Sequence, residues 1–256
     1  MIKAIFLDVD GTLMSHNLGG VPKSTTEALK QAREKGVKVF IATGRQMLEL
    51  EDLPLWESSY DGYVTLNGQI CLDKKKQVFY EELMNAEDAK ATVALFNSHE
   101  VPMMMVEKER NYVNFINDLV VQTQKAISSP LPPVGEYEGG EIFQFILYTD
   151  AEKRREVEEK LPGCRAVSWN PYAADVIPKD GDKTVGIQKM MELFRLSREE
   201  IIAFGDAEND IDMLKFAGIG VAMGNAFSIL KEQADYVTDH IDKDGIWKAL
   251  KHFQVI

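Results

Sequence analysis

A short apolar segment that ends in two carboxylates constrains this chain more than any other feature. Residues 2–7 are apolar except for Lys3 and rich in β-favouring side chains, which is typical of a strand buried on both faces of a parallel sheet. Asp8 and Asp10 follow at a spacing of two, and Gly11 marks the turn of the chain. In an extended chain this spacing directs both carboxylates to the same side. The segment therefore predicts a strand whose end carries a pair of acidic groups.

Two later segments repeat this arrangement. Residues 37–43 form an apolar segment that ends at Thr43, and residues 201–205 form another that leads into Asp206. In open α/β sheets, ligands bind beyond the carboxyl ends of the strands, where the connections diverge. We therefore predict an α/β fold with a doubly wound, Rossmann-like parallel sheet that brings Asp8, Thr43 and Asp206 to one edge.

A group of carboxylates at one edge needs compensating charge. Two close carboxylates repel, so ionising both is costly unless a cation lies between them or one keeps its proton. Taken alone, Asp8 and Asp10 have an alternative interpretation as the solvated polar end of a strand. Three strand ends with the same pattern favour a bound ligand or cation instead.

Four motifs of the chain resemble those of the haloacid dehalogenase superfamily. They are Asp8-x-Asp10-Gly11-Thr12-Leu13, Thr43-Gly44-Arg45, the isolated Lys183, and Gly205-Asp206-x-x-Asn209-Asp210. Their order and spacing are most similar to those of the Cof-type sugar-phosphate phosphatases. The motifs cover both ends of the chain, and the middle carries no comparable signature. The family's lysine is usually followed by glycine, but Thr184 follows here, so Lys179 remains an alternative to Lys183.

This resemblance implies a covalent mechanism. Asp8 would be the nucleophile that forms an aspartyl-phosphate, and Asp10 would protonate the leaving oxygen and then activate water. Asp10 would have to hold a proton in the substrate complex, which a neighbouring carboxylate and partial burial promote. Mg²⁺ prefers oxygen ligands and would bind Asp8, Asp206 and the backbone carbonyl of Asp10, while Asp210 orients Lys183 or the metal's waters. The residues expected to contact substrate are Thr43, Gly44, Arg45, Asn67, Lys183 and Asn209, and Thr43 and Lys183 are also expected to be catalytic.

The predicted function is the Mg²⁺-dependent hydrolysis of small phosphorylated metabolites, with sugar phosphates favoured by the resemblance. Such an enzyme, a phosphoric monoester hydrolase, needs several charges that converge on one phosphoryl group, because a single donor supplies only about 3–4 kcal/mol. A phosphomutase or phosphotransferase on the same core is one alternative. A non-catalytic Mg²⁺-binding sensor domain is another, although such domains are usually shorter and lack both the Asp8-x-Asp10 spacing and an inserted segment.

The charge balance limits the partners of the protein. Lys and Arg number 29 against 41 Asp and Glu, which gives a net charge of −12. Such a surface repels nucleic acid and anionic membranes, so a phosphorylated substrate must be attracted locally. Cys71 and Cys164 lack metal-ligand spacing, which suits the cytoplasm. No signal peptide, membrane span or nucleic-acid partner is predicted, and the oligomeric state stays open, with a monomer favoured.

The middle of the chain predicts a second α/β layer. Residues 83–180 have the pattern of a helix and two strands, a helix and a strand, and a helix and two strands, inserted between core segments 1–82 and 181–256. We expect this insert to be a cap domain that selects the substrate. Its first helix should be capped by Asn85 and bury the apolar positions Ala86, Ala89, Val93 and Phe96.

Helix signals in the core are more local. A capping box from Ser24 to Glu27 predicts one helix start, and a single helix is expected from Asp206 to Gly218. The helix that begins at Lys183 should place its apolar side chains in the core. These side chains are Ile187, Met190, Met191 and Phe194. The histidines show no ligand spacing and are expected on the surface: His16, His99, His240 and His252.

Overall fold

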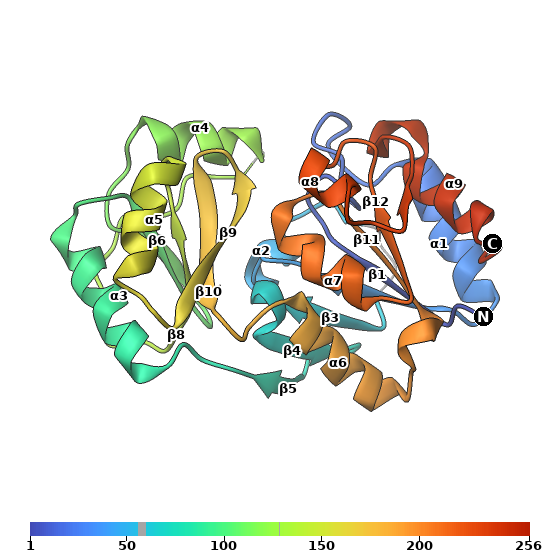
Figure 1. The fold of residues 1–256 in the computed structure, drawn as a ribbon, viewed down its shortest axis with the longest axis horizontal. Helices are drawn as coiled ribbons and strands as arrows, with labels where there is room; N and C mark the ends of the chain where they lie inside the picture. Colours follow the sequence, from blue (N-terminus) through green and yellow to red (C-terminus); the bar gives the residue numbers. More distant parts are fainter. Residues whose placement is uncertain (56–59, 128) are drawn as a thin grey trace. The chain divides into compact units, whose positions relative to one another are not determined.

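The computed structural model describes residues 1–55, 60–127 and 129–256, which divide into two compact units. The first unit comprises Met1–Glu81 and Asp182–Ile256, and the second comprises Glu82–Gly181. Figure 1 shows the second unit in green and yellow, and the first unit in blue to cyan and orange to red. Each unit is α/β, so the predicted fold class, a Rossmann-like core with an inserted α/β domain, is confirmed.

The first unit is built on a mostly parallel sheet. Within the described residues the sheet has eight strands, in the order β13-β12-β11-β1-β2-β3-β4-β5. The parallel strands are β1 (Ala4–Leu7), β2 (Lys38–Ala42), β3 (Gly62–Thr65), β11 (Ile201–Gly205), β12 (Ile219–Ala222) and β13 (Tyr236–Val237). An antiparallel pair, β4 (Ile70–Asp73) and β5 (Val78–Glu81), extends one edge.

The register of this sheet aligns the polar strand ends. Leu7 of β1 lies opposite Ile41 of β2 on one side and opposite Phe204 of β11 on the other. The side chains that follow these residues therefore emerge at the same edge. All four residues of β1 are fully buried, because neighbouring strands flank it and helices cover both faces.

Helices cover the two faces of this sheet (Figure 1). On one face, α1 (Lys23–Glu34) packs against α9 (Gly245–His252), and on the other, α6 (Lys183–Phe194) packs against α7 (Ile211–Phe216). Ile187 and Met190 of α6 are fully buried in a cluster with Phe6 and Phe40, so the predicted core role of this helix face is confirmed. The remaining helical segments are α2 (Met47–Glu51), α8 (Ser228–Lys231) and the 3₁₀ turns η1 (Leu66–Gly68), η2 (Arg198–Glu200), η3 (Glu208–Asp210) and η4 (Ile241–Lys243).

The second unit has an antiparallel sheet in the order β7-β6-β8-β10-β9. These strands are β6 (Met103–Glu107), β7 (Asn111–Val113), β8 (Ile142–Leu147), β9 (Cys164–Asn170) and β10 (Ala173–Pro178). The helices are α3 (Ala86–Ser98), α4 (Asp118–Ala126) and α5 (Ala151–Glu159). Phe96 of α3 and Val157 of α5 pack against Met105 and Phe145 of the sheet, which gives the unit its own apolar core.

Three local predictions were wrong in whole or in part. The helix α1 begins at Lys23 and has no side-chain cap, so Ser24 lies inside the first turn instead of capping it. In α3, Asn85 caps the helix and Phe96 is buried, as expected, but Ala86 is exposed and the buried positions include Asp88 and Thr92. Asp88 turns inward and accepts hydrogen bonds from Asn85 Nδ2 and the Gly163 backbone N–H. The segment after Asp206 forms η3 and then α7, and the short helix α8 was not predicted.

The helices show no sign of a membrane span. Every helix in the described part of the chain is too short or too polar to cross a bilayer.

Candidate active site

A buried lysine joins two carboxylates at the centre of the first unit. Lys183 Nζ lies 2.6 Å from Asp8 Oδ1 and 2.6 Å from Asp210 Oδ1. Lys183 and Asp210 are completely buried, and Asp8 is 6% exposed. An ammonium group has three donors and no acceptor, so it can hydrogen-bond both carboxylates at once. The three charges are thus held together in the interior, where removal of one partner would leave another uncompensated.

The first turn of α6 fixes this lysine in place. Asp182 caps the helix by accepting a hydrogen bond from the Thr184 backbone N–H at 2.6 Å. Gly68 of η1 packs against the same residue, with φ at +98°, and a Cβ atom on Gly68 would lie 2.0 Å from the Asp182 carbonyl oxygen. Glycine is therefore required at this contact. The alternative Lys179 belongs to the second unit, where its backbone N–H donates to Gly163.

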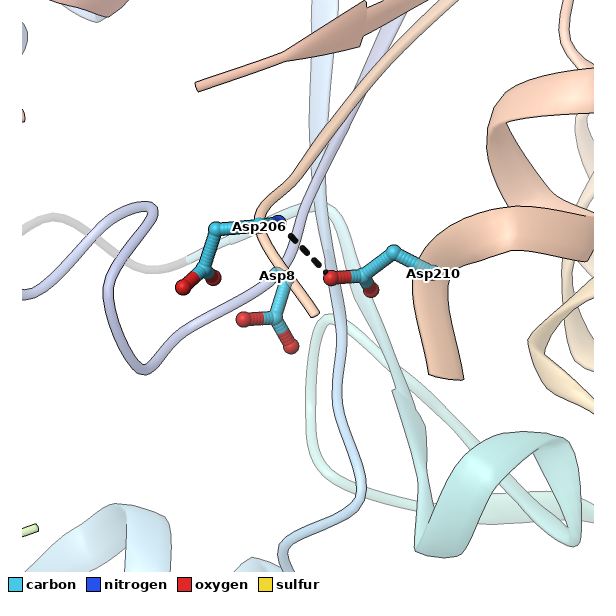
Figure 2. A group of neighbouring side chains, drawn as sticks. All are labelled: Asp8, Asp206 and Asp210. Atoms are coloured by element: carbon cyan, nitrogen blue, oxygen red, sulfur yellow. Dashed lines mark hydrogen bonds between the residues drawn. The ribbon is translucent and has the colours of Figure 1, made fainter. Parts of the chain in front are cut away.

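A third carboxylate, Asp206, joins the group. Asp8, Asp206 and Asp210 each offer an oxygen atom, and these atoms lie within 4.8 Å of one another. Figure 2 shows the three side chains gathered at the strand ends, with the Asp206 backbone N–H donating to Asp210 at 2.9 Å. Thr12 donates its hydroxyl to Asp206 Oδ1 at 2.9 Å. A Cβ atom on Gly11, whose φ is +79°, would lie 2.3 Å from Asp206 Oδ2, so this turn also requires glycine.

This group has more negative than positive charge. Burial raises the pKa of Asp8 to about 7, against the opposing effect of Lys183, and burial likewise raises the pKa of Asp206 above its ordinary value. Burial disfavours the charged form of Lys183, but Asp210 and Asp8 outweigh it and raise the pKa of the lysine. Three carboxylates around one ammonium therefore suit a divalent cation, and carboxylate oxygens are the ligands that hard cations prefer. The residues present fit such an ion.

Asp10 has different partners. Its carboxylate accepts hydrogen bonds from Arg45 at both oxygens, with Nε 2.5 Å from Oδ2 and Nη2 2.8 Å from Oδ1. His16 Nε2 lies 3.2 Å from Oδ1. Burial disfavours the charged form of Asp10, but Arg45 and His16 hold its pKa well below the ordinary range. The structure therefore favours the ionised form of Asp10, whereas the sequence suggested surroundings in which Asp10 keeps its proton.

The remaining predicted residues form a network behind these carboxylates. The Thr43 hydroxyl accepts a hydrogen bond from the Arg45 backbone N–H at 3.2 Å, which spans Gly44. The Thr43 carbonyl accepts one from the Asn67 backbone N–H at 3.0 Å. Asn209 Nδ2 donates to Asn67 Oδ1 at 3.1 Å. The residues that the sequence assigned to substrate contact thus lie on loops that are hydrogen-bonded to one another.

Comparison with known proteins identifies the family. A family model described as haloacid dehalogenase-like hydrolase matches residues 5–250. The chain belongs to the haloacid dehalogenase-like hydrolases. The chain is 31% identical to YkrA of Bacillus subtilis, over 99% of this hydrolase and 98% of YkrA. YkrA is named provisionally as a phosphatase.

Two further relatives point to the same activity. A 5-amino-6-(5-phospho-D-ribitylamino)uracil phosphatase of B. subtilis, YcsE, is 29% identical over 98% of this hydrolase and 96% of YcsE. The solved structure of BT4131, described as a HAD subclass IIB sugar phosphatase, is 39% identical with a TM-score of 0.89, covering 99% of this hydrolase and all of BT4131. The predictions of a Cof-type member of the superfamily and of a phosphatase are confirmed.

Sequence reasoning missed several residues of this site. His16 was expected on the surface, and this expectation was wrong, because the side chain is partly buried against Asp10. Asn225 was not considered, yet it donates to the Gly11 carbonyl at 2.7 Å. Thr12 could have been found, since it lies within the first motif. The contact of Asn225 left no spacing signal, because Asn225 meets its partner across 214 positions of the chain.

Proposed function

We propose that this phosphatase is Mg²⁺-dependent and hydrolyses a small phosphorylated metabolite through an aspartyl-phosphate on Asp8. The observation that carries the proposal is the buried Lys183 shared by Asp8 and Asp210 beside Asp206. These groups come from three distant segments, and they concentrate charge at one point of a protein whose net charge is −12. A site that must stabilise a phosphoryl group during displacement needs this convergence.

Asp8 would act as the nucleophile. One of its oxygens is paired with Lys183, and the other, Oδ2, accepts no hydrogen bond from the described residues. In the first step a bond forms between an Asp8 oxygen and phosphorus while the bond from phosphorus to the leaving oxygen breaks. In the second step water attacks phosphorus, which releases orthophosphate and restores the Asp8 carboxylate.

Asp10 would move the protons. It gives a proton to the leaving oxygen in the first step and takes one from the attacking water in the second. Because Arg45 stabilises the Asp10 anion, protonation of Asp10 requires this ion pair to loosen. A phosphoryl group that attracts Arg45 would have this effect. Arg45 would then bind substrate in exchange for Asp10.

The other predicted residues would hold the phosphoryl group and the metal. Lys183, Thr43 and Gly44 would contact phosphoryl oxygens, and Asn67 and Asn209 would support them through their mutual hydrogen bond. Asp8, Asp206 and the backbone carbonyl of Asp10 would bind Mg²⁺, while Asp210 holds Lys183 and the Asp206 backbone. When bound, Mg²⁺ neutralises phosphoryl charge and helps to orient the transferring group.

The substrate we favour is a phosphorylated sugar or sugar-like chain. BT4131 is described as a sugar phosphatase, and the phosphate of the YcsE substrate is carried by a ribityl chain. The residues assigned above to the metal, the phosphoryl group and proton transfer all lie outside 83–180, so we propose that the inserted domain discriminates among leaving groups. Replacing 83–180 with a short linker should abolish the substrate ranking while leaving slow hydrolysis of small esters. A soluble variant that kept the ranking would refute this role.

The decisive assay is phosphate release from a panel of phosphorylated metabolites with and without Mg²⁺. We expect release with Mg²⁺ and none with Asp8→Asn. A phosphomutase would rearrange a sugar phosphate without releasing orthophosphate, and a sensor would bind Mg²⁺ and turn over nothing. We place the enzyme in the cytoplasm as a monomer, in keeping with the unpaired Cys71 and Cys164.

A further inference from the structure

His16 contacts the carboxylate of Asp10, and the proposed chemistry assigns it no task. It lies on the loop that follows β1, and 24% of its side chain is exposed. Its Nε2 atom is 3.2 Å from Asp10 Oδ1. An ionised carboxylate only accepts hydrogen bonds, so a hydrogen on Nε2 would be the one donated in this contact. The other ring nitrogen, Nδ1, is buried and has no hydrogen-bond partner among the described residues.

The loop around His16 is anchored from both sides. Ser15 and Gly20 exchange backbone hydrogen bonds of 3.0 and 3.1 Å, which closes the loop. The side chains of Ser15 and Asn17 both donate to the carboxylate of Asp242, and the Asn17 bond measures 2.8 Å. By these contacts the two flanking residues face Asp242, while His16 faces Asp10.

This arrangement restrains Asp10 independently of Arg45. Arg45 binds both oxygens of the carboxylate, but the proposed function also gives Arg45 a phosphoryl group to bind. If Arg45 moved, a carboxylate held by it alone would be free to rotate. His16 comes from a different loop and approaches Oδ1, so it can keep one oxygen fixed while the other exchanges protons with substrate.

We propose that His16 is a positioning residue that holds the Asp10 carboxylate in the orientation for proton transfer. The inference rests on the proposed function, because it acts through the acid–base role of Asp10. It predicts that loss of the Nε2 donor slows the step that needs Asp10 and leaves substrate affinity unchanged.

Two substitutions at His16 separate the donor from the bulk of the ring. His16→Phe keeps a planar ring and removes the donor, whereas His16→Gln places an amide N–H near the former Nε2. Positioned acid–base groups contribute about 10²-fold or more, so His16→Phe should lower kcat for an alkyl phosphate by roughly tenfold or more, with KM unchanged within about twofold. His16→Gln should restore most of this loss. His99→Asn is the matched control and should behave as wild type. His99 is an exposed histidine of the second unit, and its left-handed backbone conformation is one that asparagine tolerates.

Para-nitrophenyl phosphate provides the discriminating substrate. Its leaving group hardly needs a proton, so His16→Phe should slow it much less than the alkyl phosphate. In an Asp10→Asn background, His16→Phe should cause less than about a twofold further loss, because interacting residues are not additive. The proposal would be overturned if His16→Phe lowered kcat equally for both substrates. It would also be overturned if His16→Phe lowered kcat as much in the Asp10→Asn background as in wild type.

A spectroscopic measurement keeps the test independent of turnover. In ¹⁵N-histidine NMR spectra, the signal lost in His16→Phe should report a hydrogen on Nε2 and should move in Asp10→Asn. A His16 signal that Asp10→Asn leaves in place would refute the contact. If wild type released no phosphate from any ester, the proposed function would fail, whereas an active wild type with an unaffected His16→Phe variant would refute this inference alone.

Discussion

Asp8 and Asp10 lie two residues apart at the end of one strand, yet their surroundings differ. The side chain of Asp8 is 8% exposed and is paired with a lysine that it shares with Asp210, whereas that of Asp10 is 26% exposed and has a guanidinium and an imidazole nearby. The pKa of Asp8 is raised to about 7 and that of Asp10 is held far below its usual range. Environments that separate the pKa values of two carboxylates also separate their roles.

The difference concerns the balance of charge. Asp8 belongs to a group with an excess of carboxylates, so it depends on an added cation to remain ionised. Asp10 has its compensation within the chain. We infer that the metal governs the nucleophile, while Arg45 and His16 govern the acid. The following substitutions test this division.

The largest effect should follow from Asp8→Asn. The amide keeps the shape of the side chain but cannot attack phosphorus, so kcat should fall on the order of 10⁴-fold or more, while the fold is retained. Phosphate release under saturating substrate and circular dichroism measure the two effects. Substantial residual turnover would contradict the covalent mechanism.

Lys183→Gln should affect both catalysis and folding. Removing the ammonium leaves Asp8 and Asp210 buried without compensation, which costs about 3–5 kcal/mol of the free energy of unfolding. We expect kcat to fall by roughly 10²–10³-fold, as for loss of a directed charge. Denaturant unfolding and steady-state kinetics measure these quantities. Lys179→Gln is the matched control, and an equal loss in that variant would favour the alternative lysine.

The sequence predicted the part of this site that depends on local pattern. The apolar segments before Asp8, Thr43 and Asp206 predicted parallel strands, and parallel strands bring their ends together. The site residues that follow them could therefore be grouped without a structure. The site role of Lys183 came from family resemblance, and its pairing with Asp8 was not predicted, because a helix start gives no indication of which strand it faces.

Contacts between loops could not be predicted in this way. Arg45 was expected to contact substrate, but its salt bridge to Asp10 depends on how two strand-end loops meet. His16 depends on a loop that is anchored to Asp242, 227 positions from Ser15. The start of α1 was also misplaced, because a capping box at Ser24 puts the first helical residue at Thr25, whereas the helix begins two residues earlier, at Lys23. Local pattern determines elements, and tertiary contacts determine which side chains meet.

Asp10→Asn should have a smaller effect that depends on the leaving group. For alkyl phosphates kcat should fall on the order of 10²-fold, and for para-nitrophenyl phosphate the loss should be less, because its leaving group departs without a proton. The ratio of the two losses is the measured quantity. If both substrates lost activity equally, Asp10 would act through the metal or through structure instead of through proton transfer.

The smallest effect should be a pH-dependent stability of the metal-free protein. The pKa of Asp8 rises from 3.8 to about 7 on folding, so the stabilisation present below about pH 4 is lost as the pH rises through about 7. Asp10 has the opposite sign: its pKa is lowered, so its contribution is present above about pH 4 and is lost only in more acidic solution.

Thermal unfolding with a chelator, between about pH 4 and pH 7.5, measures this dependence. We expect Tm to fall by several degrees as the pH rises, and saturating Mg²⁺ to remove the fall by binding the folded state. Asp8→Asn should flatten the metal-free curve. If neither Mg²⁺ nor Asp8→Asn changed the Tm, the cluster of Asp8, Asp206 and Asp210 would not carry uncompensated negative charge.

The central claim is that Asp8 attacks phosphorus and forms a covalent intermediate. The stereochemical outcome at phosphorus tests it directly, with a substrate whose phosphoryl group is made chiral by sulfur and oxygen isotopes and is hydrolysed in labelled water. Each in-line displacement inverts phosphorus, so attack by Asp8 followed by attack by water predicts overall retention. Inversion would mean that water displaces the leaving group in a single step, and it would contradict the account.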